Sequence, residues 1–321
     1  MFFFEKKTDS NKHYKLSFIM LVILYFVYFL SDTNSLTFSR ISSIVDSASP
    51  LLLASAGVTV VALIGGFDLS VVGTISLTNV IISTHYLEGG VGAFLSIAFS
   101  ILIGGIIGLI NGTIITLSKI QSVAISLSIM IIVNGLSLLI LDAPGGEVSE
   151  WIGDHFTGLS FGIIPNALII PLFVLCLWGI IKKTDLGTSL YAVGSDSKNS
   201  YLSGIKTKKI EIFTYTLAGC FYGLSGFMLS AQTETGDPSS GMPFLLLSFA
   251  ALALGGTSLS GGRGGLLGSY LGAFSLIMAQ KILFSIGLAS FYIGLFQGIL
   301  LLIGVYYSVF IDSKFESKKN G

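Results

Sequence analysis

The most restrictive feature of this chain is a series of long apolar runs, of which the longest, Val91 to Leu117, contains no charged side chain. Of the 321 residues 52% are hydrophobic and only 11% are charged, whereas soluble domains carry about 25% charged residues. A helix needs roughly 20 mostly apolar residues to cross a bilayer core about 30 Å thick. The sequence therefore predicts an integral membrane protein.

Ten candidate spans can be placed with this criterion, and they predict an all-α, polytopic fold. They cover residues 16–30, 50–65, 69–85, 91–117, 122–141, 163–181, 210–232, 242–256, 266–285 and 288–309. The first run is followed by "SDTNSL", which lacks a small-x-small cleavage pattern, so we expect a retained anchor rather than a signal peptide. The chain then divides into an N-terminal tail (1–15), a transmembrane domain (16–311) and a C-terminal tail (312–321).

Lysines and arginines predict the orientation, because they concentrate in cytoplasmic segments. With ten spans and both termini inside, 15 of the 17 basic residues fall on the inner side, and only Arg40 and Lys281 fall outside. The longest outer loop, "DAPGGEVSEWIGDHFTGLSFG", instead carries four acids. Ten spans with cytoplasmic termini therefore satisfy the charges, whereas nine or eleven would put the lysines of one terminus outside.

The longest inner segment runs from Lys182 to Glu211 and is too polar to enter the bilayer. Its middle, "SDSKNSYLSGI", offers Ser195 or Asp196 as an N-cap and Gly204 as a C-terminal stop, which predicts a short helix at the inner surface. A solvated connector anchored by its lysines is the alternative that these features leave open.

Two hexapeptides of similar sequence interrupt apolar runs: "GGFDLS" at residues 65–70 and "GGTSLS" at residues 255–260. A glycine pair can end a helix because glycine adopts positive φ without steric cost. Asp68 and, at the matching position, Ser258 can accept a hydrogen bond from the first free N–H groups of a following helix. Both hexapeptides therefore predict a helix stop followed by a helix start, toward the cytoplasmic side.

Asp68 is the only acid between Asp46 and Glu88. An ionisable residue near membrane depth is a functional candidate, but a helix cap that touches interfacial water explains it equally well. The glycine-rich "GGTSLSGGRGG" is no phosphate cradle of the Walker A kind, because the chain contains no G-x-x-x-x-G-K-[ST].

Within the spans, glycines recur at helical spacing, which predicts close helix packing inside one bundle or between two copies. The rows are Gly104, Gly105, Gly108 and Gly112; Gly219, Gly223 and Gly226; and Gly264, Gly268 and Gly272. Neutral amide side chains also lie within the predicted spans. They can hydrogen-bond a hydroxylated solute without the desolvation cost of a charge. The pathway candidates are Asn79, Asn111, Asn134 and Gln232, with Gln280 and Gln297 as further amides, although interhelical bonding is the commoner role.

The sequence does not predict an enzyme. His13, His85 and His155 lie in a tail and in outer loops without a helical metal-binding pair. Cys176 and Cys220 fall inside apolar runs and are too few for a disulfide framework. No serine has the G-x-S-x-G setting of a hydrolase.

Three segments carry a resemblance to a known family: "GGFDLSVVGTISL", the inner segment from "LYAVGSDSKNSYLSGIKTKKIE" onward, and "DPSSGMPFLLLSFAALALGGTSLSGGRGGLLGSYLGA". From about Pro50 to the end the chain resembles the ribose-type permease subunits of ABC sugar importers, within the wider group that includes branched-chain amino-acid and nucleoside permeases. The N-terminal 15 residues depart from the pattern, and Ser195 and Asp196 stand where many relatives have Gly and Asn.

The resemblance implies a permease in the bacterial cytoplasmic membrane that pairs with a second permease subunit, a cytoplasmic ABC ATPase and an external sugar-binding protein. It implies no cofactor on this chain, since ATP and Mg would be bound by the ATPase. The segment of about residues 182–209 would be the coupling segment, with contacts from Ala192, Gly194, Ser195, Asp196, Tyr201, Leu202, Ser203, Gly204 and Ile205. The two breaks would be flexing points, formed by Gly65, Gly66, Asp68, Ser70, Gly255, Gly256, Ser258 and Ser260.

The solute stays open between a pentose, a hexose, a related furanose and a nucleoside. An ion-coupled secondary transporter is the competing class, but it would be expected to hold acids within its spans, and Asp68 is nearly alone there. A scaffold protein of the membrane, without any solute flux, is a further class.

Overall fold

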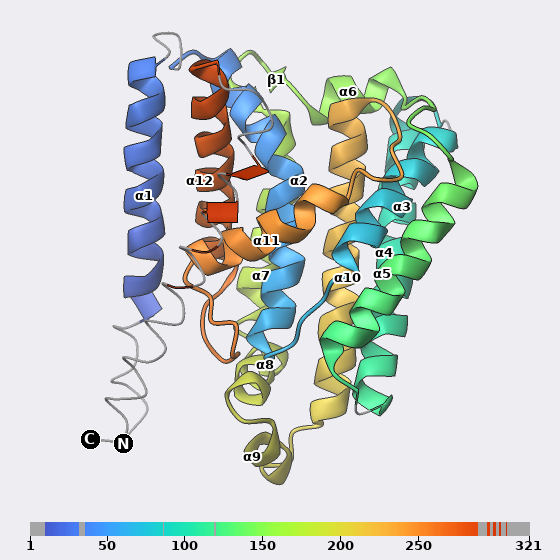
Figure 1. The fold of residues 1–321 in the computed structure, drawn as a ribbon, viewed down its shortest axis with the longest axis vertical. Coiled ribbons are helices and arrows are strands. Elements are labelled where there is room, and N and C mark those ends of the chain that lie inside the picture. Colours follow the sequence, from blue (N-terminus) through green and yellow to red (C-terminus); the bar gives the residue numbers. More distant parts are fainter. Residues whose placement is uncertain are drawn as a thin grey trace.

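The computed structural model describes residues 10–31, 36–85, 87–118 and 120–287, together with six isolated positions between 294 and 306. The described part is a helical bundle (Figure 1) with the helices α1 (Ser10–Ser31), α2 (Phe38–Leu63), α3 (Val71–Thr84), α4 (Gly89–Ser118), α5 (Ser122–Ile140), α6 (Glu150–Phe156), α7 (Ile169–Ile181), α8 (Asp185–Ser195), α9 (Ser197–Leu202), α10 (Thr207–Thr233), α11 (Met242–Leu254) and α12 (Leu266–Ser285). A two-stranded hairpin, β1 (Leu159–Ser160) and β2 (Ile164–Pro165), and a 3-10 turn, η1 (Asn166–Leu168), precede α7.

The helix lengths confirm a polytopic membrane protein. Five of the described helices (α2, α4, α5, α10 and α12) are long and apolar enough to cross a bilayer. A sixth span results if Asn166–Ile181 and Asp185–Ser195, which meet at a bend of 83°, are counted together. The apolar parts of α1, α3 and α11 are shorter than a full span. The expected tenth span, residues 288–309, lies outside the described residues apart from isolated positions, so the number ten stays a prediction.

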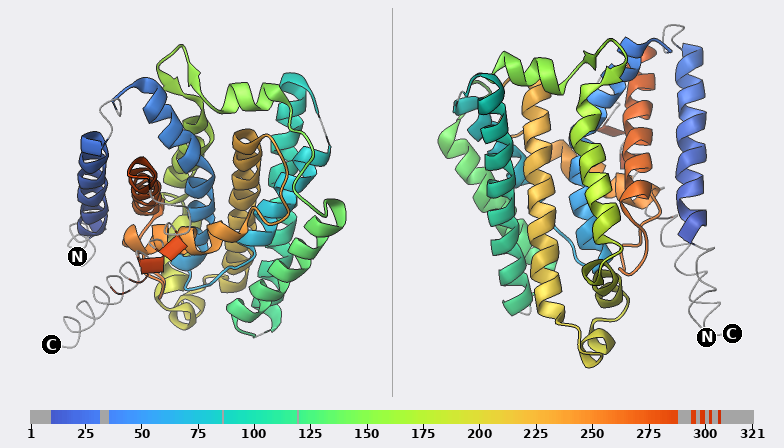
Figure 2. Two further views of the ribbon diagram at one scale, coloured as in Figure 1. Left: turned by 45° about the horizontal axis from the view of Figure 1, so that its top comes forward. Right: turned by 180° about the vertical axis from the view of Figure 1, so that it is seen from behind.

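Helices α2 and α10 form the centre of the bundle, and α4 and α5 form its rim. The most apolar window of α2 is 89% buried and that of α10 is 72% buried, against 33% for α4 and 22% for α5. In two views α1 stands at one edge beside α12, and α4 and α5 stand at the opposite edge (Figures 1 and 2). The exposed apolar side chains of α4 and α5 are what lipid or a second subunit would cover.

The expected glycine rows pack inside this one bundle. A Cβ on Gly104 of α4 would collide with the carbonyl of Gly219 in α10, and a Cβ on Gly219 would collide with the carbonyl of Gly104. On α12, a Cβ on Gly272 would collide in the same way with the carbonyl of Ala251 in α11. Only glycine lets these backbones approach so closely. Gly264 is an exception to its predicted row, because it lies in the loop before α12.

The two polar segments lie at opposite ends of the bundle. Helices α8 and α9, from the segment expected inside, lie at the lower end in Figure 1, whereas α6 and β1, from the loop expected outside, lie at the upper end. This placement agrees with the sequence, which predicts the two segments on opposite sides of the membrane. We refer to these as the inner and outer ends.

Candidate functional site

The first glycine corner ends α2 with a Schellman motif. Gly65 has a φ of +74°, and the N–H of Gly66 donates to the carbonyl of Val61 at 3.1 Å. The chain is then not helical over residues 66–69, and α3 begins at Val71 after a turn at Ser70. The predicted helix stop and helix start are both present here, with the glycine in the left-handed conformation that the motif requires.

The second corner ends α11 in the same way but one residue later. Here Gly256, the second glycine of the pair, has the positive φ of +73°, Gly255 is the C-cap, and the N–H of Thr257 donates to the carbonyl of Leu252 at 3.2 Å. The two corners share a further bond: Ser70 N–H donates to Asp68 Oδ1 at 2.9 Å, and Ser260 N–H donates to Ser258 Oγ at 3.2 Å.

The predicted helix start after the second corner is wrong. Helix α12 begins at Leu266, eight residues beyond Ser258, so Ser258 caps no helix. Residues 261–265 read "GGRGG", and Gly261, Gly262 and Gly264 all have positive φ. A run of glycines has no side chains to pack and a high entropic cost in a helix, so the chain forms a loop until the first apolar residue. Residues 255–265 are called the glycine loop below.

Asp68 fixes the first corner to the neighbouring helix α4. The carboxylate is 1% exposed, and its Oδ1 accepts bonds from Ser70 Oγ at 2.6 Å and from Asn111 Nδ2 at 3.0 Å. The sequence predicted that Asp68 would cap the following helix, but Ser70 is the residue before α3, so Asp68 bonds the turn that leads into the helix and not the helix itself. Asn111, a pathway candidate, serves here to hold Asp68.

The loop around Asp68 is tied to two further helices. The hydroxyl of Tyr215 in α10 donates to the carbonyl of Phe67 at 3.3 Å, and the N–H of Phe67 donates to Ser122 Oγ at 3.2 Å, at the start of α5. The ring of Phe67 also stacks on Phe249 of α11, with centroids 5.9 Å apart. The interruption between α2 and α3 is therefore covered by protein on several sides, as a helix broken within a membrane would require.

The two corners meet each other, which the sequence did not predict. The N–H of Gly262 in the glycine loop donates to the carbonyl of Leu63, the last residue of α2, at 2.8 Å. A Cβ on Gly65 would lie 3.3 Å from the carbonyl oxygen of Ser260. The end of α2 and the loop after α11, about 190 residues apart in the chain, thus form one junction.

The end of α8 completes this junction. A Cβ on Gly194 would collide with the carbonyl of Leu63 and would lie 2.7 Å from the N–H nitrogen of Gly262. A Cβ on Gly262 would lie 3.0 Å from the Cα of Ser195. The hydroxyl of Tyr191 donates to the carbonyl of Gly264 at 2.8 Å, and the ammonium of Lys182 lies 5.5 Å from the centroid of the Tyr191 ring. We call the contacts of Leu63, Gly194, Gly262 and their neighbours the inner junction.

The short surface helix expected in "SDSKNSYLSGI" is present as α9. Asp196 is its N-cap and accepts a bond from Asn199 N–H at 2.9 Å. Gly204, with a φ of +88°, follows its end, and Ile205 N–H donates to the carbonyl of Ser200 at 3.1 Å. The side chains of Tyr201 and Leu202 are 68% and 72% exposed. The helix therefore presents two large apolar groups at the inner end of the molecule.

Helix α8, in which Ala192, Gly194 and Ser195 lie, was not predicted from the sequence. Its signal is the spacing of Leu186, Leu190 and Val193, at i, i+4 and i+7. Leu190 and Val193 are buried. Tyr191, which reaches the glycine loop from this helix, was not among the predicted site residues.

The other pathway candidates lie in three different settings. Asn79 is 1% exposed; its amide donates to Ser230 Oγ at 3.0 Å, and its Oδ1 accepts from Asp237 N–H at 2.7 Å, so it holds the chain before α11. Gln232 is exposed at the outer end of α10. Asn134 Oδ1 is buried, with no hydrogen-bond partner among the residues that the structure describes.

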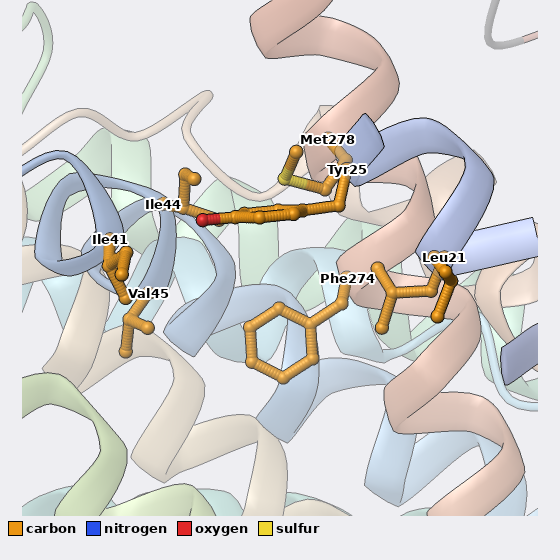
Figure 3. A pocket seen from close by; sticks show the side chains of 8 residues that line it. Leu21, Tyr25, Ile41, Ile44, Val45, Phe274 and Met278 are labelled. Carbon is orange, nitrogen blue, oxygen red and sulfur yellow. The ribbon is translucent and has the colours of Figure 1, made fainter. Parts of the chain in front are cut away.

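A groove of about 310 Å³ lies between α1, α2 and α12 (Figure 3). Its lining comes from Leu21, Val22, Tyr25, Ile41, Ile44, Val45, Phe274 and Met278. Apart from the hydroxyl of Tyr25 these side chains offer no hydrogen-bonding oxygen or nitrogen, so the groove does not suit a hydroxylated solute.

Comparison with known proteins agrees with this architecture. Residues 40–305 match the family model described as "Branched-chain amino acid transport system / permease component". The chain is 28% identical over 305 residues to "Ribose import permease protein RbsC" of Haemophilus influenzae, with 93% of this chain and 94% of the relative covered. It is 32% identical over 259 residues to the Bacillus subtilis protein of the same name, with 79% of each covered.

A relative named for a different solute is similar over almost as much of the chain. The chain is 28% identical over 300 residues to "Autoinducer 2 import system permease protein LsrC" of Yersinia pestis, with 92% of this chain and 84% of the relative covered. No solved structure matches the chain.

Proposed function

Because the chain belongs to the family of permease components of branched-chain amino acid transport systems, we propose that it forms the membrane pathway of an ABC importer for a monosaccharide. The solute would be a ribose-like pentose, a hexose or a related furanose, delivered by an external binding protein. The similarity to permeases named for the import of ribose and of autoinducer 2 supports a small hydroxylated solute.

The observation that carries the mechanism is the inner junction. An ATPase can move a permease only through a contact at the inner surface that leads to the spans. Tyr201 and Leu202 of α9 offer such a contact, and α8, which directly precedes α9, ends against Leu63 and Gly262. A displacement of α8 and α9 would therefore act on the ends of α2 and α11 together.

The glycines of the corners suit such a movement. Gly65, Gly256 and Gly262 already occupy left-handed backbone conformations, in which glycine changes its dihedral angles at little steric cost. The short helix α3 follows the first corner, and the short helix α11 precedes the second. Broken helices of this kind commonly lie at transport pathways. In this account the corners are the hinges, and Asp68 is a clamp that holds one of them.

The expected topology and assembly belong to the same proposal. We propose ten spans with cytoplasmic termini in the bacterial inner membrane, and a second permease subunit against the exposed rim of α4 or α5. ATP and Mg would be bound by the ATPase subunits. A nucleoside is the alternative solute, and an ion-coupled transporter is the alternative class.

Cross-linking tests the docking of the ATPase on α9. In a variant with Cys176→Ser and Cys220→Ser, a cysteine introduced by Leu202→Cys should cross-link to the ATPase subunit expressed with this chain. Val91→Cys is the control, since Val91 is 77% exposed but lies at the outer end of α4. Equal cross-linking from both positions, or none from position 202 in an assembled complex, would count against the proposed docking.

The solute is tested with the assembled importer in liposomes. Uptake driven by internal ATP should occur with one of a panel of ribose, hexoses, autoinducer 2 and nucleosides together with its binding protein. Preference for a nucleoside would select the alternative solute.

A further inference from the structure

The hairpin of β1 and β2 has an apolar tip that takes no part in the proposed transport mechanism. Phe161, Ile163 and Ile164 are 94%, 57% and 54% exposed. They lie in and beside the turn between β1 and β2, at the outer end of the bundle (Figures 1 and 2). A group of large exposed apolar side chains on a protein marks an interaction site.

The backbone of the turn is held in a conformation that a phenylalanine avoids. Phe161 and Gly162 have φ values of +54° and +71°, and Ile163 N–H donates to the carbonyl of Ser160 at 3.2 Å. Positive φ at both central positions is the pattern of a type I′ turn, where Asn, Asp or Gly normally stands first. A bulky residue at positive φ is strained, and such strain points to a function of that side chain.

The base of the hairpin is fixed to α2. Ser42 Oγ donates to the carbonyl of Gly158 at 2.8 Å, and Asn166 N–H donates to the same carbonyl at 3.0 Å. The strands pair Leu159 with Pro165 and Ser160 with Ile164. The hairpin is therefore a fixed projection that holds the Phe161 ring away from the bundle.

The length of α7 sets the depth of this tip. Helix α7 has 13 residues, which span about 20 Å, whereas a bilayer core is about 30 Å thick. Lys182 and Lys183 directly follow it and place its other end at the inner surface. Ile169 then lies below the outer surface of the membrane, and η1 and the hairpin must occupy the remaining depth.

The charges of the outer loop divide at the hairpin. Asp142, Glu147, Glu150 and Asp154 are all exposed in the first part of the loop. From Thr157 to Ile181 the chain carries no charged residue at all. The hairpin also leads through η1 into α7, whose Leu172 and Phe173 are exposed and, in a helix that enters the membrane, would be covered by lipid. The tip is thus the outer continuation of a lipid-facing surface.

We infer that the hairpin tip is a membrane anchor, in which Phe161, Ile163 and Ile164 enter the headgroup and upper acyl region of the outer leaflet beside α7. Phenylalanine and other large apolar side chains of membrane-surface segments bury at this boundary between headgroups and acyl chains. At this level of the bilayer, water still reaches the backbone groups of the turn that make no hydrogen bond within the hairpin.

Spin labels measure this depth directly in the full chain in liposomes. In the variant with Cys176→Ser and Cys220→Ser, a nitroxide is attached to Phe161→Cys, with Ile163→Cys as a second position and Asp154→Cys as the water-exposed control. At positions 161 and 163 dissolved oxygen, which partitions into lipid, should relax the label more than a water-soluble nickel chelate does. At position 154 the order should be reversed.

A water-exposed tip would overturn the inference: labels at 161 and 163 would then respond to the chelate as position 154 does. If the labels at 161 and 163 are reached by the chelate until the external binding protein is added, and are shielded from it afterwards, the tip contacts a protein partner. That result would also overturn the inference. The measurement needs neither ATP nor solute, so its result is separate from the fate of the proposed transport function.

Discussion

Gly262 donates its backbone N–H to the carbonyl of Leu63 at 2.8 Å, and this bond joins the end of α2 to the loop that follows α11. The carbonyl of Leu63 is also the atom that a Cβ on Gly194 would strike. Three segments distant in sequence thus meet at one backbone group.

Gly194→Ala should reduce ATP-driven uptake severely. The added methyl group has to displace Leu63 or Gly262, and overpacking of this kind costs typically about 1–3 kcal/mol. Gly179→Ala in α7 is the matched control, since a Cβ there would meet no described atom within 4 Å. Thermal unfolding in detergent and uptake in liposomes should both change for the first variant only. Wild-type uptake by Gly194→Ala would show that the contact with α2 is unimportant.

Tyr191→Phe should partly uncouple ATP hydrolysis from uptake. It removes the bond to the carbonyl of Gly264, worth about 1 kcal/mol of stability, and loosens the glycine loop from α8. Tyr270→Phe removes a comparable bond, from α12 to the carbonyl of Pro171 in α7 at 3.1 Å, which does not hold the glycine loop to α8. We expect both variants to lose similar stability, but only Tyr191→Phe to transport less solute per ATP hydrolysed. If both variants transport the same amount of solute per ATP hydrolysed, the role of Tyr191 is only structural.

Much of the local structure could be predicted from the sequence, because it depends on neighbours in the chain. The cap at Asp196, the stop at Gly204 and the left-handed glycine at the first corner all follow from the preferences of single residues. The glycine rows predicted close packing, and Gly104 and Gly219 provide it.

Contacts between distant segments could not be predicted in this way. Nothing near Gly65 in the sequence indicates that Ser260 lies beside it, or that Asn111 would bind Asp68 rather than a solute. The second corner misled because its hexapeptide resembles the first, while the five residues after it, "GGRGG", prevent a helix. Helix α8 was not predicted because it is short and lies in a polar segment, which was recognised as outside the bilayer but not searched for the spacing of its few apolar residues.

Asp68→Ala should destabilise the protein by about 1–3 kcal/mol, because Ser70 and Asn111 lose their buried acceptor. Asp68→Asn should be milder, since the amide oxygen can still accept these bonds. Amounts of folded protein in the membrane, and thermal unfolding in detergent, measure this order. Solute preference should stay unchanged in both variants. A changed preference at normal protein levels would place Asp68 in the pathway instead.

Gly104→Ala should prevent α4 from packing on α10, because the methyl group would occupy the position of the Gly219 carbonyl. We expect loss of folded protein. Gly135→Ala in α5 is the control, since a Cβ there would meet no described atom within 4 Å, and alanine should be tolerated or slightly stabilising at this helical position. Normal amounts of the Gly104→Ala protein would contradict the close packing of the two helices.

The most direct test of the whole account is solute accumulation in liposomes that contain this chain with and without its ATPase subunit. With the ATPase, the external binding protein and internal ATP, the solute should accumulate against its gradient, and an uncoupler that abolishes ion gradients should not prevent this. Without the ATPase, accumulation should be absent. Uphill uptake by this chain alone, or uptake that follows an imposed ion gradient, would contradict the account.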